Sequence, residues 1–304
     1  MSTKTLLTIA LGAFMALPAL AQKPIEVGYV NLADTDVFCM SRKTSLIAAA
    51  QGSSFHLNFA DANNDIQKQL DAADTFIAKK VDMLVLVPVD STGIVPAITK
   101  ANAAGIPVIC LGIKADSGNY TFVGSQNYDA GFMQGALFAK LLPKNGKVLY
   151  LAGTAGLSHS FDRRKGFKEA LVKAGRGDVQ ILADMDGDYT RAKGLSITED
   201  WLQTFPKFDA VVAANDQMAL GAVEALKGAK RLAGVSVTGI DGTKDACLAV
   251  KNGEMVQTVL QNAPGQAKAC LEAMQKLAAK QAVQKEILVP FESITKDNVD
   301  KYMK

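Results

Sequence analysis

Two stretches of the sequence, Val81-Asp-Met-Leu-Val-Leu-Val-Pro-Val-Asp90 and Phe208-Asp-Ala-Val-Val-Ala-Ala-Asn-Asp216, follow one pattern and decide the fold. Each is a short apolar run with an aspartate near its start and another at its end. A segment with helical periodicity follows each run, and a second apolar run then begins near Gly105 or Gly234. A strand, a helix and a second parallel strand produce this pattern. The chain therefore uses one β-α-β unit twice, once in each half.

The same alternation of short β-branched runs and helical segments continues over the rest of the chain, which predicts an α/β fold with parallel sheets. We expect two similar, doubly wound lobes with a ligand-binding cleft where the carboxyl ends of their strands meet. The predicted strands are 25–31, 55–59, 83–87, 108–111, 121–123, 147–151, 179–183, 210–213, 235–240, 256–260 and 286–289. The predicted helices include 66–78, 129–142, 164–173, 192–204 and 217–226.

The N-terminus has the pattern of a secretory signal peptide. Lys4 precedes an apolar run from Leu6 to Leu20, and the small residues of Ala19-Leu-Ala21 end it. This order predicts export and cleavage after Ala21, which leaves the mature chain in the periplasm. A membrane anchor is the weaker alternative, because the run is short for a bilayer span. No cysteine directly follows the cleavage site, so a lipid anchor is not indicated.

Composition excludes several classes of protein. The 304 residues exceed the usual length of one domain, which favours two domains. A net charge of +3, with both signs scattered along the chain, gives no reason to expect a nucleic-acid partner. Two histidines and four cysteines without CxxC spacing predict no metal site, and no cofactor motif is present. Whether Cys247 and Cys270 form a disulfide is left open, because export would favour one.

Polar residues at the ends of predicted strands are the candidate ligand contacts. Asn215 and Asp216 follow one strand, Asp241 ends the next, and Gln261 ends a third. One of the Asn215-Asp216 pair should cap the following helix while the other faces the cleft. Each residue also has a purely structural interpretation as a cap, a turn residue or an exposed strand end.

Three aromatic residues, Phe38, Phe161 and Tyr189, lie in loops or first helical turns after strands, where a ring can stack on the apolar face of a sugar. Core packing is the alternative for each of them, and it is the expectation for Trp201 in the middle of a helix.

The segment Ser158-His-Ser-Phe-Asp162 contains the residue types of a hydrolytic triad, but they lie on one local segment, whereas triads are assembled from separate elements. His159 is expected at a cleft rim or a helix entry. There is no GxSxG elbow, Walker loop or GxGxxG after a strand. These observations favour a binding protein over an enzyme.

Several motifs together resemble the periplasmic sugar-binding proteins of ABC importers, in particular the group of the ribose-binding protein. They are Ile25-Glu-Val-Gly-Tyr-Val30, Gly105-Ile-Pro-Val-Ile109, Tyr189-Thr-Arg-Ala-Lys-Gly194, Asn215-Asp-Gln-Met-Ala-Leu-Gly-Ala222 and Gly239-Ile-Asp-Gly-Thr243. The resemblance covers nearly the whole mature chain.

The resemblance implies a monomer that delivers a monosaccharide or sugar-like polyol to a permease in the inner membrane. It implies an N-terminal lobe of residues 24–125 plus 262–289 and a C-terminal lobe of 126–261 plus 290–304, with the three crossings as a hinge. The residues that match the family's ligand contacts are Phe38, Tyr189, Asn215, Asp241 and Gln261.

The chain also departs from that family. Gly112-Ile113 stands where relatives that bind ribose carry an adjacent Asp and Arg, and Phe161 appears in place of a second arginine. A ligand other than ribose is therefore expected, such as a deoxy sugar, a methylated ring or an inositol. The charged residues that can compensate are Asp34, Asp36, Arg42 and Arg163, with Asp34 and Arg163 expected first.

The sequence leaves open a sensory receptor of the same fold, which would pass ligand binding to a membrane partner other than an importer. A transcription regulator with this fold is disfavoured by the signal peptide and by the lack of an N-terminal helix-turn-helix segment.

Overall fold

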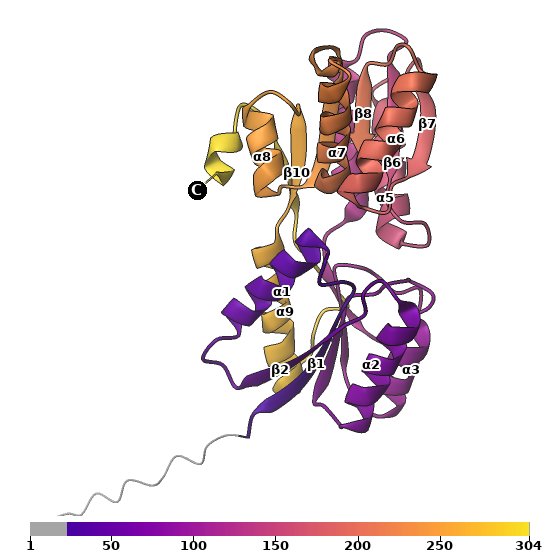
Figure 1. Cartoon of the computed structure of the whole chain (residues 1–304). Coiled ribbons are helices and arrows are strands. Elements are labelled where there is room, and N and C mark those ends of the chain that lie inside the picture. The colour runs from indigo at the N-terminus through magenta and orange to yellow at the C-terminus, as the bar shows by residue number, and fades with distance from the viewer. Residues whose placement is uncertain (1–22, 304) are drawn as a thin grey trace, which may run out of the picture.

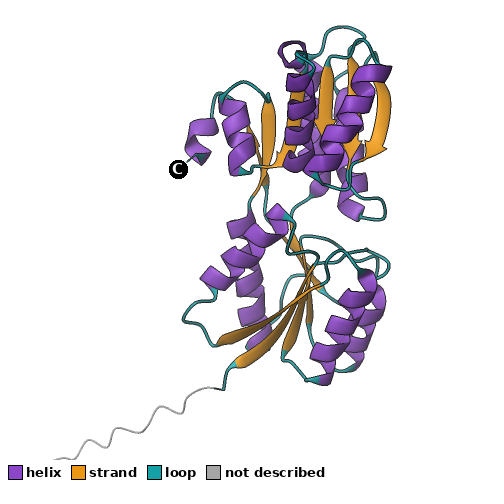
Figure 2. Ribbon diagram, viewed as in Figure 1, coloured by secondary structure: helices purple, strands orange, loops and turns teal. Residues whose placement is uncertain are grey.

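The computed structural model describes residues 23–303 and consists of two α/β lobes, each built on a six-stranded sheet (Figures 1 and 2). The predicted signal peptide, residues 1–21, lies outside the described residues. The strands are β1 (Ile25–Asn31), β2 (Phe55–Asp61), β3 (Met83–Leu86), β4 (Val108–Leu111), β5 (Thr121–Gly124), β6 (Lys147–Ala152), β7 (Gln180–Asp186), β8 (Ala210–Ala213), β9 (Ser236–Asp241), β10 (Gln257–Gln261), β11 (Glu286–Leu288) and β12 (Phe291–Ile294).

Helices connect most consecutive strands, and nearly all of the strand pairs are parallel. The α-helices are α1 (Val37–Ala49), α2 (Ile66–Ala78), α3 (Val95–Ala103), α4 (Asn127–Leu141), α5 (Ser158–Lys173), α6 (Arg191–Thr204), α7 (Asp216–Gly228), α8 (Lys244–Lys251) and α9 (Ala263–Ala278). Two short 3₁₀ helices lie at Leu232–Gly234, after α7, and at Val299–Tyr302, after β12. Within the described chain, no helix is long and apolar enough to cross a membrane.

The two sheets have matching strand orders, which confirms the internal repeat. One runs β2-β1-β3-β4-β5-β11 and the other β7-β6-β8-β9-β10-β12. The repeated sequence units form β3-α3-β4 and β8-α7-β9, and they occupy equivalent places in the two sheets. All four residues of β3 and of β8 are buried, as expected for central strands covered on both faces.

Helices from distant parts of the chain cover each sheet. On the first sheet, α1 and α9 pack over one face and α2 and α3 over the other (Figure 1). On the second sheet, α4 and α5 pack over one face, while α6, α7 and α8 pack over the opposite face. Because both faces of each sheet are closed, only the ends of the strands are free to bind a ligand.

The chain passes between the two sheets three times. It leaves the first after β5, returns after β10 and crosses again between β11 and β12. Strand β12, which the sequence analysis did not predict, pairs antiparallel with β10. Its sequence, Phe-Glu-Ser-Ile, directly follows Pro290 and contains one β-branched residue, so it lacks the β-branched run by which the other strands were found.

The disulfide that the sequence left open between Cys247 and Cys270 is absent. Cys247 lies in the core beside α7 and α8, whereas Cys270 lies in the core under α1 and α9 in the other lobe. All four cysteines are free and buried. Trp201 is buried in a core, as predicted.

The free cysteines give a testable prediction. When the protein, purified without reductant, is unfolded and alkylated, mass spectrometry should find four labels per chain, because all four thiols are free and buried in the folded structure. Prior reduction should not raise that number. Two labels before reduction and four after it would contradict the thiol assignment.

Candidate functional site

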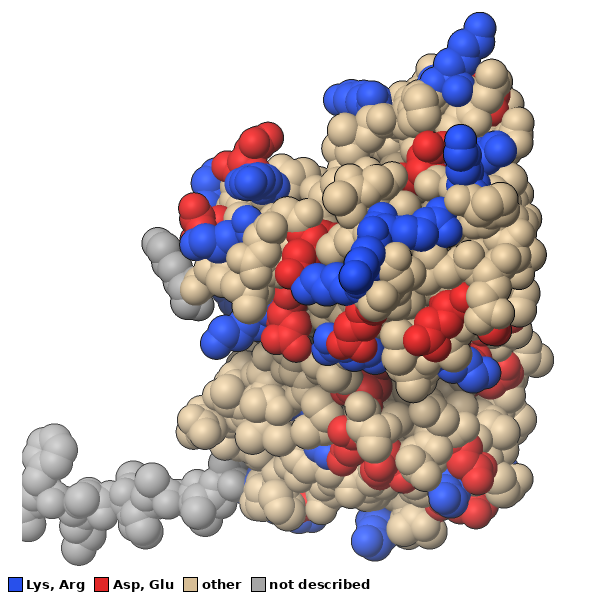
Figure 3. Space-filling view, turned by 45° about the horizontal axis from the view of Figure 1, so that its top comes forward, with Lys and Arg blue, Asp and Glu red and all other residues tan. Residues whose placement is uncertain are grey.

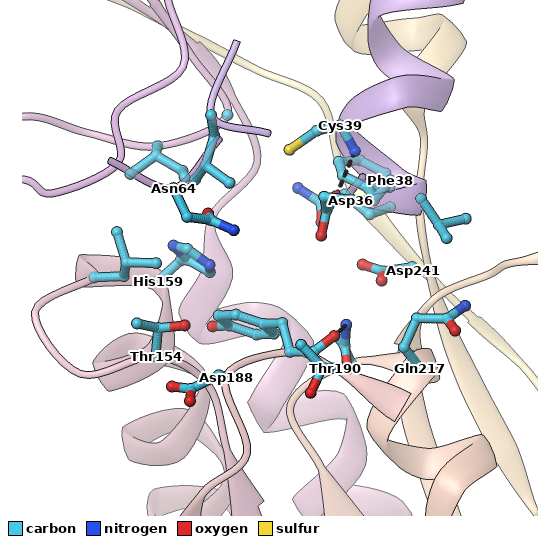
Figure 4. A pocket seen from close by; sticks show the side chains of 18 of the residues that line it. Asp36, Phe38, Cys39, Asn64, Thr154, His159, Asp188, Thr190, Gln217 and Asp241 are labelled. Atoms are coloured by element: carbon cyan, nitrogen blue, oxygen red, sulfur yellow. Dashed lines mark hydrogen bonds between the residues drawn. The ribbon is translucent and has the colours of Figure 1, made fainter. Parts of the chain in front are cut away.

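A cavity of about 520 Å³ lies between the lobes, at the carboxyl ends of the strands of both sheets (Figure 4). Val89 and Gly112, which line it, follow β3 and β4 of the first sheet. Tyr189, Asn215 and Asp241 line the opposite side and come from the ends of β7, β8 and β9. The volume is in the range typical of small-molecule sites, and the location is the one at which open α/β sheets bind ligands.

Six of the eight predicted site residues line this cavity. They are Phe38, Arg163, Tyr189, Asn215, Asp241 and Gln261. The structure thus brings together residues from six separate segments of the chain. Their contact with a ligand stays a prediction.

The other two predicted residues, Asp34 and Phe161, do not line this cavity. Asp34 forms an ion pair with Lys43, with its Oδ2 atom 2.6 Å from Nζ, and its Oδ1 accepts a hydrogen bond from Asn31. Phe161 is 66% exposed. It lies two residues before Arg163 on α5, and this spacing directs the two side chains to different faces of the helix. Only Arg163 can face the cavity.

Asp241 is the least satisfied charged group of the site. The residue is 7% exposed, and its backbone has a φ of +133°, which is rare for a residue other than glycine. Burial raises the pKa of this carboxyl well above its ordinary value, although nearby Arg163 acts in the opposite direction. A carboxylate in this setting is stabilised by hydroxyl donors, which a ligand in the cavity can supply.

Asn215 and Asp216 divide their roles differently from the prediction. Asn215 both lines the cavity and caps α7, because its Oδ1 accepts a hydrogen bond from the Met218 amide at 3.0 Å. Asp216 is fully buried behind it and accepts hydrogen bonds from Thr243 and Thr258. The aspartate therefore joins the end of β9 to β10 and leaves the asparagine to face the ligand site.

Arg163 is held in place by three neutral acceptors. Its Nε donates to Oδ1 of Asn127 at 3.0 Å, its Nη1 to the Ala214 carbonyl at 2.6 Å, and its Nη2 to Oε1 of Gln261 at 2.8 Å. These bonds orient the guanidinium without cancelling its charge. Gln261, predicted as a direct ligand contact, thus also positions this arginine.

The apolar wall of the C-terminal lobe is a stacked pair of rings, Tyr189 on His159. The ring centroids are 5.0 Å apart and the planes are inclined by 17°. A side chain at Gly153 would overlap the Tyr189 ring, so the glycine makes room for it. Burial lowers the pKa of His159 well below its usual value, and the imidazole is therefore neutral. Phe38 adds a third aromatic ring to the cavity from α1.

The structure adds further lining residues to the predicted set. Asp36 and Arg42 belonged to the charged candidates, whereas Asn64, Thr154 and Gln217 carried no signal in the sequence beyond their polarity. Asp36 also caps α1 through a bond from the Cys39 amide. The acidic and basic lining residues other than His159 are three aspartates and three arginines, namely Asp36, Asp188, Asp241, Arg42, Arg163 and Arg191. The cavity therefore carries no net charge.

Comparisons of the sequence with known proteins agree on one protein family. Residues 27–282 match the model of the periplasmic binding protein domain. The chain is 34% identical to a putative rhizopine-binding protein of Rhizobium meliloti, over 81% of this chain and 82% of that one. It is also 34% identical to the ribose import binding protein of Bacillus subtilis, over 88% of this chain and 87% of the relative.

Solved structures agree with the sequence relatives. A solute-binding protein of an ABC transporter from Bacillus halodurans, with bound myo-inositol, superposes with a TM-score of 0.87 and is 31% identical in sequence. The match covers 93% of this chain and 99% of that one. The two-lobed architecture is therefore shared over essentially the full length of the described residues.

The burial of Asp241 predicts that Asp241→Asn stabilises the unliganded protein at pH 7. The folded carboxyl has a raised pKa, so its ionisation opposes folding at every pH above the value of the unfolded chain, about 3.9. The gain in melting temperature should be largest at neutral pH and should vanish as the pH falls below about 4, where the wild-type carboxyl is protonated in both states. Calorimetry between pH 4 and pH 8 measures this.

Asp188→Asn is the matched control for this prediction. Asp188 lines the same cavity and also has a positive φ, but it is partly exposed and pairs with Lys193. Its substitution should change the free energy of unfolding by less than about 0.5 kcal/mol. A loss of stability in Asp241→Asn, or a gain that does not depend on pH, would disprove the interpretation.

Proposed function

The chain belongs to the periplasmic binding protein family, and from this membership we propose that it is a receptor that binds a neutral monosaccharide or cyclic polyol between its lobes. The receptor delivers that ligand to an ABC import permease in the inner membrane. One observation carries the proposal: the cavity takes paired acceptors and donors from both lobes, and their charges cancel.

The polar groups of the cavity suit a polyhydroxylated ligand. A carboxylate such as Asp241 accepts hydrogen bonds from two neighbouring hydroxyls, while Arg163 donates to hydroxyl oxygens. Asn215 can add a donor or an acceptor. The rings of Tyr189 and Phe38 offer apolar faces to the C–H surface of the ligand. A compact ring with hydroxyls on its edge satisfies all of these groups together.

The balance of charge disfavours an ionic ligand. An anion or a cation would leave an unmatched charge in a partly buried cavity, which is energetically costly. The relative with bound myo-inositol supports a cyclic polyol as the first candidate. Gly112 and Ile113 provide no polar side chain at the end of β4, which agrees with a ligand other than ribose.

We also propose that the mature protein lies in the periplasm, after cleavage of residues 1–21, and that it is a monomer without catalytic activity.

We propose lobe boundaries that assign 24–125 and 262–289 to the N-terminal lobe and 126–261 and 290–304 to the C-terminal lobe. The assignment of β11 to the first sheet and β12 to the second supports these boundaries. On the face seen in Figure 3, Lys and Arg are interspersed with Asp and Glu rather than gathered by sign.

A thermal-shift screen tests the proposed ligand class. The mature chain, refolded to remove bound ligand, should be stabilised by inositols, alditols or monosaccharides and not by amino acids or nucleosides. At 100 times its dissociation constant, a ligand stabilises the folded state by about 2.7 kcal/mol, which is readily detected. Stabilisation by the amino acids or nucleosides alone would refute the assignment to neutral polyols.

Asp241→Asn should weaken binding of the active compound by roughly 10-fold to 150-fold, because hydrogen bonds to a charged group contribute about 1.5 to 3 kcal/mol. Asp34→Asn, the same substitution outside the cavity, should change the affinity less than about twofold. Isothermal calorimetry compares both variants with the wild type. Equal losses in the two variants would show that the cavity has been placed wrongly.

A further inference from the structure

Arg42 is a buried cation that faces the cavity with most of its donors unused. It is 2% exposed and lines the cavity from α1. Its Nη1 donates to Oε1 of Gln266 at 3.3 Å, and its Nη2 makes a weak contact of 3.6 Å with Sγ of Cys39. Its Nε has no partner among the described residues. A guanidinium has five N–H groups, so ligand oxygens are the natural acceptors for those that remain.

Gly112 provides the space that this guanidinium occupies. A Cβ atom at position 112 would overlap Nη1 of Arg42 and lie 2.7 Å from Cζ. The glycine also has a φ of +83°, which other residues rarely adopt. The positive charge at the end of β4 thus comes from α1, and Arg42 and Gly112 form one structural unit.

Gln266 connects Arg42 to two of the crossings between the sheets. It is fully buried in the first turn of α9, just after the crossing that follows β10. Its Nε2 lies 2.9 Å from Oγ of Ser125, which is in the crossing after β5. One amide group therefore joins the arginine to both crossings on the side of the N-terminal lobe. Gln266 does not line the cavity itself.

Arg163 makes an equivalent connection on the side of the C-terminal lobe. It donates to Asn127, which begins α4 after the first crossing, and to Gln261, which ends β10 before the second. The same two crossings are thus joined twice, once near each lobe, and each connection includes an arginine that faces the cavity. The described residues provide no carboxylate that forms an ion pair with either guanidinium.

From this arrangement we propose that Gln266 is a positioning residue that orients Arg42 toward the ligand and links it to the hinge. Oxygens of a ligand that bridges Arg42 and Arg163 bring the two lobes together, and the two connections pass that movement to the crossings. Arg42 and Gly112 then determine which ligand hydroxyls are accepted on the side of the N-terminal lobe. The role in ligand binding rests on the proposed function; the link to the hinge does not.

The first experiment needs no ligand. Spin labels are attached to cysteines introduced at two exposed positions, one in each lobe, by Gln51→Cys and Lys207→Cys. The native cysteines are all buried, so the labels react with the introduced ones. Gln266→Met should broaden the distribution of interlobe distances measured by pulsed electron spin resonance. Gln266→Glu should restore the wild-type distribution, because a carboxylate can accept hydrogen bonds from both Arg42 and Ser125.

Gln134→Met is the matched control. Gln134 is an equally buried glutamine whose side chain bonds to β8 and β9 and does not contact Arg42. The substitution Gln134→Met should leave the distribution of interlobe distances unchanged. Wild-type distances in Gln266→Met, or equal broadening in Gln134→Met, would overturn the link to the hinge.

The second experiment is a double-mutant cycle that measures the affinity for myo-inositol. If the wild type instead binds another compound of the screen, the cycle uses that compound. Arg42→Met should weaken binding about 10-fold or more. Gln266→Met should weaken it at least threefold in the wild type and should have no further effect in Arg42→Met. The same fold-change in both backgrounds would overturn the positioning role. A wild type that binds no sugar or polyol would instead refute the proposed function, while the distance measurement still decides the hinge role.

Discussion

The carboxyl ends of two parallel sheets face each other across three short crossings, and this arrangement determines where every polar group of the site can lie. Parallel strands need crossover helices, which close both faces of a sheet and bury its central strands completely. Polar side chains are then excluded from β3 and β8 and collect where these strands end. Asn215 and Asp241 show the result, because Asn215 lies two residues after the buried strand β8 and Asp241 ends β9.

The cavity is lined by buried charged groups whose desolvation is energetically costly. Asp241 is buried with a raised pKa and an unusual backbone angle, while Arg42 and Arg163 keep their charges among neutral acceptors. A buried charged group without enough hydrogen-bond partners lowers the stability of the fold, and ligand hydroxyls can supply the hydrogen bonds that Asp241 and Arg42 lack. The same feature explains why a neutral ligand is sufficient: the positive and negative groups balance each other, and the ligand needs only to connect them.

The sequence predicted the fold well because the strands are short, buried and β-branched. Strands β4 and β8 and helix α2 have the predicted bounds, and the repeated β-α-β unit occupies equivalent places in both sheets. The direction in which individual side chains point was harder to predict from the sequence. Asp34 was chosen from a run of acidic residues in which Asp36 is the one that faces the cavity, and Phe161 lies on a different face of the helix from Arg163. Gln266 had no signal, because its role depends on contacts with Arg42 and Ser125, which are distant in sequence.

Ligand binding by this protein requires that both lobes hold one neutral ligand at once. A crystal structure of the mature protein, grown with the compound that gives the largest thermal shift, shows whether they do. We expect closed lobes with Asp241 and Asn215 on one side of the ligand and Arg42 on the other, each within hydrogen-bonding distance of a ligand oxygen. A ligand bound to one lobe only, or outside the cavity, would contradict this expectation.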